Sequence, residues 1–151
     1  MRKVKFLAVV LFLCNYNYGQ TEFKKILLEH NFKVIVKKEE IPLAIFKKIE
    51  VESLSEIANP NQKRNFSCIP SKGVPDERLN WAATDNENWI ISTTTGGFAI
   101  ITHYYLISKG NKKIEHLKIG NETPYEFNVF KEKYISGAIE KDRIDYGKPK
   151  E

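Results

Sequence analysis

The chain has 151 residues, of which 42% are hydrophobic and 28% are charged. This length allows one domain with its own core, and the composition excludes a coiled coil, a collagen-like chain, a cysteine-stapled miniprotein and a chain disordered throughout. The net charge of +5 suggests an anionic partner such as nucleic acid, and the two cysteines suggest a disulfide.

The first nineteen residues have the layout of a secretory signal peptide. A basic start at residues 1–5 is followed by an unbroken apolar run at residues 6–13 and then by a polar stretch. This run is too short to cross a bilayer as a helix, which needs about 20 residues. A buried N-terminal strand or helix is the alternative, but a basic start before an uncapped apolar run favours a signal. We expect cleavage between Gly19 and Gln20, although Asn17 matches the small-residue rule poorly.

The end of this segment also bears on location. Tyr18, Gly19 and Gln20 resemble the end of export signals from Bacteroidota-type Gram-negative bacteria, and the resemblance concerns the signal alone. A lipoprotein signal is the competing interpretation, because Cys14 follows the apolar run, but such signals place a small residue where Leu13 stands. We therefore expect a periplasmic or extracellular protein of a Gram-negative bacterium, with no transmembrane span.

Removal of the signal changes both the net charge and the number of cysteines. Arg2, Lys3 and Lys5 leave and no acid does, so residues 20–151 carry 21 basic and 19 acidic side chains, a net charge of +2. Cys68 is then the one cysteine left, which excludes an internal disulfide. Export and a nearly neutral domain together argue against nucleic-acid binding.

The mature domain is expected to span residues 20–136 and to begin with helices. Helical spacing of apolar residues after Thr21 predicts a helix over 21–31. Residues 32–36 look briefly strand-like, and a second, short helix is predicted from about Pro42 to residue 50. Its core side would carry Ile41, Ile45 and Ile49.

Two segments carry no clear pattern. Residues 58–77 form a long connection with three prolines, which is either functional or hides an element. Residues 137–151 are predicted to be a charged, disordered tail.

Alternating apolar and polar residues predict an antiparallel meander between these segments. Strands are predicted at 78–83, 89–95, 98–108, 112–119 and 125–129. The turns between them are predicted at 85–87, 96–97, 110–111 and 121–124, with Gly96-Gly97 as a two-residue hairpin turn.

These turns fix the expected register, because directly opposed residues share a face of a sheet. They place Trp81 opposite Ile91, Trp89 opposite Tyr104, and Tyr104 opposite Leu117. One face would then be an apolar floor of Leu79, Trp81, Ala83, Trp89, Ile91, Phe98, Ile100, Tyr104, Leu106, Leu117 and Ile119. We predict an α+β fold in which the N-terminal helices pack on this one face of a four- to five-stranded antiparallel β-meander.

The opposite face is predicted to gather polar side chains. It would carry Asn80, Ile90, Ser92, Thr94, Ile101, His103, Tyr105, Ile107, Ile114, His116 and Lys118. Tyr105 would lie opposite His116, and His103 opposite Lys118. The candidate ligand-binding residues are His103, Tyr105, His116, Ser92 and Thr94. The alternative is a partly solvent-exposed outer face without a ligand, whose residue types reflect β-strand propensity.

Catalytic and metal sites have weaker support. A metal at His103 and His116 would need a third ligand, because Glu115 is expected on the other face. Cys68 with either histidine would make a Cys–His nucleophile by residue type, but no cysteine-hydrolase signature surrounds it, and a packed thiol is the alternative. Common metalloprotease, serine-hydrolase, phosphate-loop and dinucleotide motifs are absent.

The sequence therefore predicts a non-enzymatic exported binding or accessory protein without a cofactor. Its partner would be an envelope protein, a peptide or a small ligand. The alternative is a small secreted hydrolase or metal-dependent enzyme that uses Cys68, His103 or His116.

Overall fold

The computed structural model describes residues 22–67, 69, 71–97, 99–111, 114–120 and 124–144. The chain divides into two compact units, residues 1–31 and 32–151. In the first unit, residues 22–29 form the predicted helix, and its packing on the sheet stays a prediction. The predicted signal, its cleavage site at Gly19 and Gln20, and both Cys14 and Cys68 lie outside the described residues.

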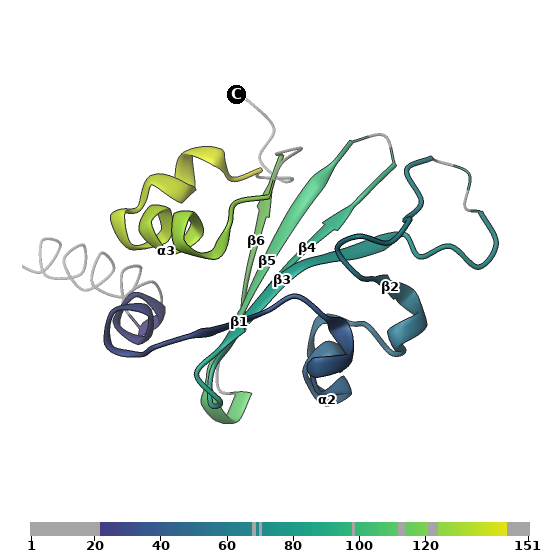
Figure 1. The fold of residues 1–151 in the computed structure, drawn as a ribbon. Helices are drawn as coiled ribbons and strands as arrows, with labels where there is room; N and C mark the ends of the chain where they lie inside the picture. The colour runs from purple at the N-terminus through teal and green to yellow at the C-terminus, as the bar shows by residue number, and fades with distance from the viewer. Residues whose placement is uncertain are drawn as a thin grey trace, which may run out of the picture. The chain divides into compact units, whose positions relative to one another are not determined.

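The second unit is built on a six-stranded sheet (Figure 1). Its main path, with antiparallel neighbours, runs through β1 (Lys33–Ile35), β3 (Glu77–Thr84), β4 (Trp89–Thr95), β5 (Ile101–Ile107) and β6 (Ile114–Ile119). β2 (Ile57–Ala58) pairs in parallel with the start of β3. The prediction of an α+β fold with an antiparallel sheet is confirmed. β2 was not predicted, because two residues are too few to show an alternating pattern.

Short helical elements lead from β1 to β2 and others follow β5 and β6. The first group is η1 (Lys38–Glu40), α2 (Leu43–Phe46), η2 (Lys47–Ile49) and η3 (Leu54–Glu56). The second group is η4 (Lys109–Asn111), α3 (Phe127–Ser136) and η5 (Ala138–Asp142). Figure 1 shows α2 and α3 on opposite sides of the sheet.

The face covered by the segment from η1 to β2 is called the α2 face here. Its side chains include Ala82, Ile91, Tyr105 and His116, which lie in line across β3 to β6. The buried cluster on it consists of Ile35, Ile41, Phe46, Ile49, Val51, Ile57, Leu79, Ala82, Ile91 and Ile107. Ile41 and Ile49 are buried and Ile45 packs against the cluster, as the spacing of the three predicts.

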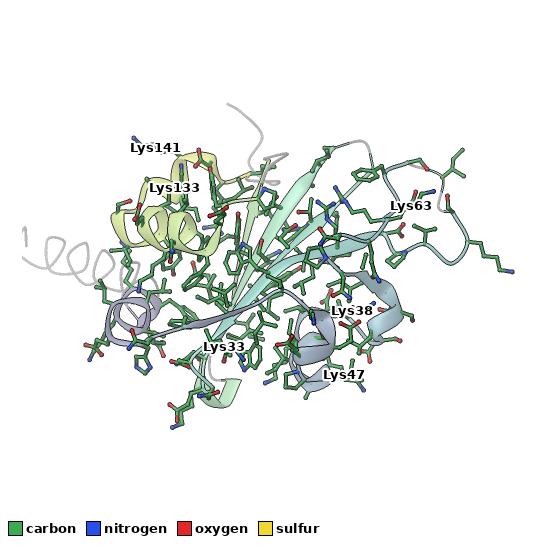
Figure 2. All side chains as sticks on the ribbon, viewed as in Figure 1. Lys33, Lys38, Lys47, Lys63, Lys133 and Lys141 are labelled. Atoms are coloured by element: carbon green, nitrogen blue, oxygen red, sulfur yellow. The ribbon has the colours of Figure 1, made fainter. Side chains whose placement is uncertain are left out.

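Lys38 holds this covering segment together. Its Nζ donates to the carbonyl oxygens of Leu54 and Ile57, each at 2.6 Å. Figure 2 labels Lys38 beside α2, where its side chain joins η1 to η3 and β2. These bonds give two backbone carbonyls of the covering segment a hydrogen-bond partner.

The other face is covered by α3 and is called the α3 face. It carries Trp81, Ser92, Tyr104 and Leu117. Phe130 of α3 is fully buried, and its ring stacks on Tyr104 with the ring centroids 4.5 Å apart. The same ring lies 5.7 Å from that of Trp81. These contacts fix the helix on the middle of the sheet.

The predicted strand at 125–129 is wrong, because α3 begins at Phe127. Phe127, Phe130 and Tyr134 are the buried residues of this segment, and they recur at helical spacing, whereas Val129 is 42% exposed. The alternation of Tyr125, Phe127 and Val129 is therefore coincidental. The Tyr125 backbone instead bonds to two side chains of the α3 face: its carbonyl accepts from Trp81 Nε1 at 2.7 Å, and its N–H donates to the Tyr104 hydroxyl at 2.8 Å.

One predicted register is correct and one is shifted by three residues. Tyr104 lies opposite Leu117 as predicted, but Trp89 lies opposite Ile107 and not Tyr104. An odd shift moves β5 and β6 to the other face relative to β4. The cause is Gly96, which does not serve as a tight turn, so residues 96–100 connect the strands. A Cβ at Gly96 would lie 2.7 Å from the Asn65 carbonyl oxygen, so glycine is needed here for close approach of the long connection.

The second departure begins at the β3–β4 turn, where Thr84 pairs with Trp89, so that four residues (85–88) and not three connect the strands; a β-bulge between Leu79 and Trp81 takes up this one-residue shift. Trp81 lies opposite Ser92 and not Ile91, which turns the indole onto the α3 face. The amide nitrogen of Asn80, within the bulge, donates to Ser92 Oγ at 3.0 Å and to Thr94 Oγ1 at 2.8 Å. Because Asn80 finds polar partners on β4, the irregularity leaves its side chain satisfied.

The predicted apolar floor is consequently divided between the two faces. Trp81, Ala83, Tyr104, Leu106, Leu117 and Ile119 lie on the α3 face, and Leu79, Trp89 and Ile91 lie on the α2 face. Helical segments cover both faces of the sheet, where the sequence predicted one covered face.

Residues 138–142 lie within the segment that the sequence assigned to a tail, yet they form η5. Ile139 is 2% exposed. The N–H of Ile144 donates to the Lys118 carbonyl at 2.8 Å, beside a bridge between Ile119 and Arg143. The fold therefore extends at least to Ile144.

Candidate functional site

Three of the five predicted binding residues meet on the α2 face. Tyr105 lies opposite His116 and His103 lies opposite Lys118, as predicted. His103 Nδ1 is 2.9 Å from His116 Nε2, and the rings of Tyr105 and His116 stack with centroids 4.2 Å apart. His103, Tyr105 and His116 are called the histidine cluster below.

Ser92 and Thr94 do not belong to this cluster. Both are fully buried on the α3 face, where they bond to Asn80. The three-residue shift between β4 and β5 separates them from the histidines. Their role in the structure is to satisfy the bulged residue of β3.

A hydroxyl outside the predicted set completes the cluster. Thr95 Oγ1 lies 3.0 Å from His103 Nε2, so His103 is hydrogen-bonded through both ring nitrogens. In a neutral imidazole one nitrogen donates and the other accepts. The donor and acceptor roles of the two hydrogen bonds of His103 are therefore coupled. If one ring nitrogen donates, the other accepts. Thr95 was missed because the predicted two-residue turn placed it next to the hairpin end, opposite Phe98.

The surroundings keep both imidazoles uncharged at neutral pH. Burial, with the positive charges that His116 and Lys118 can carry, lowers the pKa of His103 to about 4. Burial, with Lys118, also lowers the pKa of His116, which the Glu50 carboxylate partly opposes. The pair is thus a neutral hydrogen-bonding unit rather than a cationic one.

Two half-buried oxygen acids, Glu77 and Tyr105, lie on the same face. Burial raises the pKa of the Glu77 carboxyl, and Glu77 lies opposite Thr95 in the sheet. Burial, together with the charges of Glu77 and Glu50, raises the pKa of the Tyr105 hydroxyl, which therefore stays protonated. Sequence analysis did not select Glu77, because it was assigned to the long connection, although it opens the alternating pattern of β3.

The histidine cluster borders a cavity of about 210 Å³. Its lining consists of Lys48, Ile49, Glu50, Tyr105, Ile114 and His116. Lys48 and Ile49 belong to η2, and Glu50 follows them with a φ of 67°, in the left-handed region. Such a conformation is unfavourable for glutamate, and backbone strain of this kind is concentrated at functional sites. The cavity is thus lined by an ammonium, a carboxylate, an imidazole and a phenol.

The described residues do not offer a metal site. Within these ranges, no group of three or more His, Cys, Asp or Glu side chains is arranged to hold a metal ion. The two imidazoles supply two ligands, and Glu115 lies on the α3 face, where it accepts from the Tyr134 hydroxyl at 2.9 Å. No helix in the described ranges is long and apolar enough to cross a membrane.

In comparisons with protein-family models, with curated proteins and with solved structures, the chain matches no family, no curated protein and no solved structure. The chemistry of the site therefore has to be argued from its own geometry.

Proposed function

We propose that this chain is an exported, non-enzymatic binding protein that holds a small polar ligand in the cavity beside the histidine cluster. The observation that carries the proposal is that Tyr105, His116 and Glu50 line one cavity although they come from β5, β6 and the end of η2. Pockets of this kind combine apolar walls with a few polar groups that orient the ligand.

The charges of the cavity suggest the class of ligand. Lys48 and Glu50 place opposite charges on one rim, and His116 and Tyr105 add neutral groups that can donate or accept. Ile49 and Ile114 supply apolar contact. A zwitterion of modest size, such as an amino acid or a short peptide, is complementary to the two charges and to both kinds of wall.

Thermal unfolding with a panel of free amino acids and dipeptides tests this proposal, because a ligand that binds the folded state raises the melting temperature. We expect at least one member to raise it, and the rise to shrink in Glu50→Gln and in His116→Gln. Lys47→Gln is the matched control, since Lys47 is exposed and lies three residues before Glu50 but does not line the cavity. A panel without effect, or an effect that both cavity variants retain, would contradict the proposal.

The export part of the proposal rests on the basic, apolar and polar order of residues 1–19. We expect the protein, expressed in a Gram-negative host, to appear in the periplasmic or medium fraction with Gln20 as its first residue. A lipid-modified Cys14 at the N-terminus would support the tethered alternative, and an uncleaved cytoplasmic chain would contradict export.

A further inference from the structure

Two arginines lie close together near the start of β3, where Arg78 belongs to the α3 face. Arg64 comes from the long connection and is 2% exposed. Its Nη1 donates to the Thr94 carbonyl at 3.0 Å, and Thr94 lies directly opposite Arg78 in the pairing of β3 with β4. The long connection thus places a second guanidinium near Arg78.

The charges of this pair lack a counter-ion in the part of the chain that the structure describes. Both Nε atoms are buried without a hydrogen-bond partner there. None of the ion pairs within 4.0 Å among these residues involves Arg64 or Arg78. Arg64 instead lies over the ring of Phe66, 4.3 Å from its centroid. Burying a charge without a partner costs free energy, and two like charges raise that cost.

The electrostatic strain is visible on Arg64 itself. Burial and the positive charge of Arg78 both lower the pKa of the Arg64 guanidinium. An anion bound at Arg78 would offset this repulsion, because its negative charge would lie close to both positive charges.

Arg78 also lines a cavity of about 250 Å³. The other lining residues are Pro60, Asn80, Trp81, Pro124, Tyr125 and Glu126. The amide of Asn80 is already bonded to Ser92 and Thr94, and the indole N–H of Trp81 to the Tyr125 carbonyl. Arg78 is therefore the positive side chain in the described lining, among aromatic and proline surfaces, with the Glu126 carboxylate as the opposing charge.

We propose that this cavity binds the carboxylate or phosphate group of a small molecule with a flat, apolar body. Arg78 takes the oxyanion through its planar guanidinium, and Arg64 adds a second positive charge next to it. Trp81, Tyr125 and the two prolines contact the body of the ligand. The site lies on the face opposite the histidine cluster, so this proposal does not depend on the proposed function.

Tryptophan fluorescence can report binding directly, because Trp81 lines the cavity and the chain has two tryptophans. In the Trp89→Phe protein, Trp81 is the one remaining tryptophan and can be excited selectively at the red edge of its absorption. The probes are phosphate, phenyl phosphate, acetate and benzoate, each compared with chloride at equal ionic strength. We expect a saturable change with a phosphate or a carboxylate pair of probes, tighter for the aromatic member of that pair. Which pair binds tells whether the ligand is phosphorylated or carboxylated.

Three variants in this background make the test specific. Arg78→Gln should weaken binding at least tenfold, since it removes the hydrogen-bonding charge. Lys63→Gln, an exposed base on the same connection that Figure 2 labels, should leave binding unchanged. Glu126→Gln removes the opposing charge and should tighten binding about threefold. This gain cannot arise from misfolding, so it protects the test if Arg78→Gln fails to fold. A response that depends on ionic strength alone, or equal binding by wild type and Glu126→Gln with no loss in a folded Arg78→Gln, would overturn the proposal.

Discussion

The ring of His103 is held without a charge by the groups around it. It is 9% exposed, and both of its nitrogens are hydrogen-bonded, to Thr95 and to His116. A proton on this ring would lose hydration and would face the positive charge of Lys118. In the unfolded chain the same ring takes up its proton near pH 6.5. The folded state therefore opposes a protonation that the unfolded state permits.

This difference predicts an acid-sensitive stability. Between pH 6.5 and about 4 the unfolded chain binds the His103 proton and the folded chain does not, so stability falls as pH falls through this window. The contribution to the free energy of unfolding is about 3 kcal/mol at most. Urea unfolding at several pH values should show this loss for wild type and a flatter profile for His103→Gln. His30→Gln, a change in the other compact unit, is the control, and an equal profile in His103→Gln would contradict the explanation.

Replacing Glu50 is expected to raise the stability of the protein and to weaken ligand binding. Its φ of 67° suits glycine or asparagine better than glutamate, so Glu50→Asn should raise the free energy of unfolding by about 0.5–1 kcal/mol. The same change removes a charge from the cavity and should weaken ligand binding. Glu52→Asn, at an exposed residue with no positive φ, should leave both nearly unchanged. Denaturant unfolding and the amino-acid panel measure the two effects, and a destabilised Glu50→Asn protein would contradict the argument from backbone strain.

Among the elements, α3 contributes most of the cover on its face of the sheet. Phe130 is fully buried between Tyr104 and Trp81, so Phe130→Ala should cost about 3–5 kcal/mol of unfolding free energy. Val129 precedes it on the same helix but is 42% exposed, and Val129→Ala should cost less than about 0.5 kcal/mol. Chemical denaturation of both variants checks the contrast. Similar losses in the two would mean that helix propensity, and not packing on the sheet, holds α3.

Elements were predictable from the sequence where the pattern is local. The alternating residues of β3, β4, β5 and β6 gave their positions, and the β5–β6 register followed from the turn between them. The β4–β5 register could not be predicted in this way. Gly96 packs closely against the Asn65 carbonyl, which comes from a distant part of the chain, and does not form the tight turn. The shift of Trp81 has another origin, because the β3–β4 turn takes four residues, 85–88, where the pattern predicted three. The β4–β5 failure therefore traces to a contact that is remote in sequence, and the β3–β4 failure traces to the length of a local turn.

The same distinction explains the site. His103, Tyr105 and His116 were grouped correctly because β5 and β6 form one hairpin. Thr95 and Glu77 join them only in the observed registers of β4 with β5 and of β3 with β4. Lys48 and Glu50 reach the cavity only because η2 packs over the sheet. A single sequence carries no signal for such packing.

At the scale of the whole second unit, residues after α3 complete the fold. Truncation after Ser136 removes buried Ile139, the Ile144 hydrogen bond to Lys118, and the Asp142 carboxylate that accepts from the Tyr125 hydroxyl at 2.8 Å and from Lys133 Nζ at 3.0 Å. We expect this truncation to lower the free energy of unfolding by about 3 kcal/mol or more. Truncation after Ile144 keeps every contact of the described residues and should cost little. Thermal or urea unfolding compares the two chains, and equal stability would contradict a structural role for η5.

The sheet has partners along part of each outer edge. On one side, β1 pairs with the end of β3 and β2 pairs with its beginning. On the other, Arg143 bridges to Ile119 and Ile144 bonds to Lys118. A long, free strand edge is a template on which other chains can add strands and aggregate. Because short pieces from distant parts of the chain occupy part of these edges, they shorten the strand edge that the folded chain presents to its neighbours, and they link protection against aggregation to segments outside the main strands.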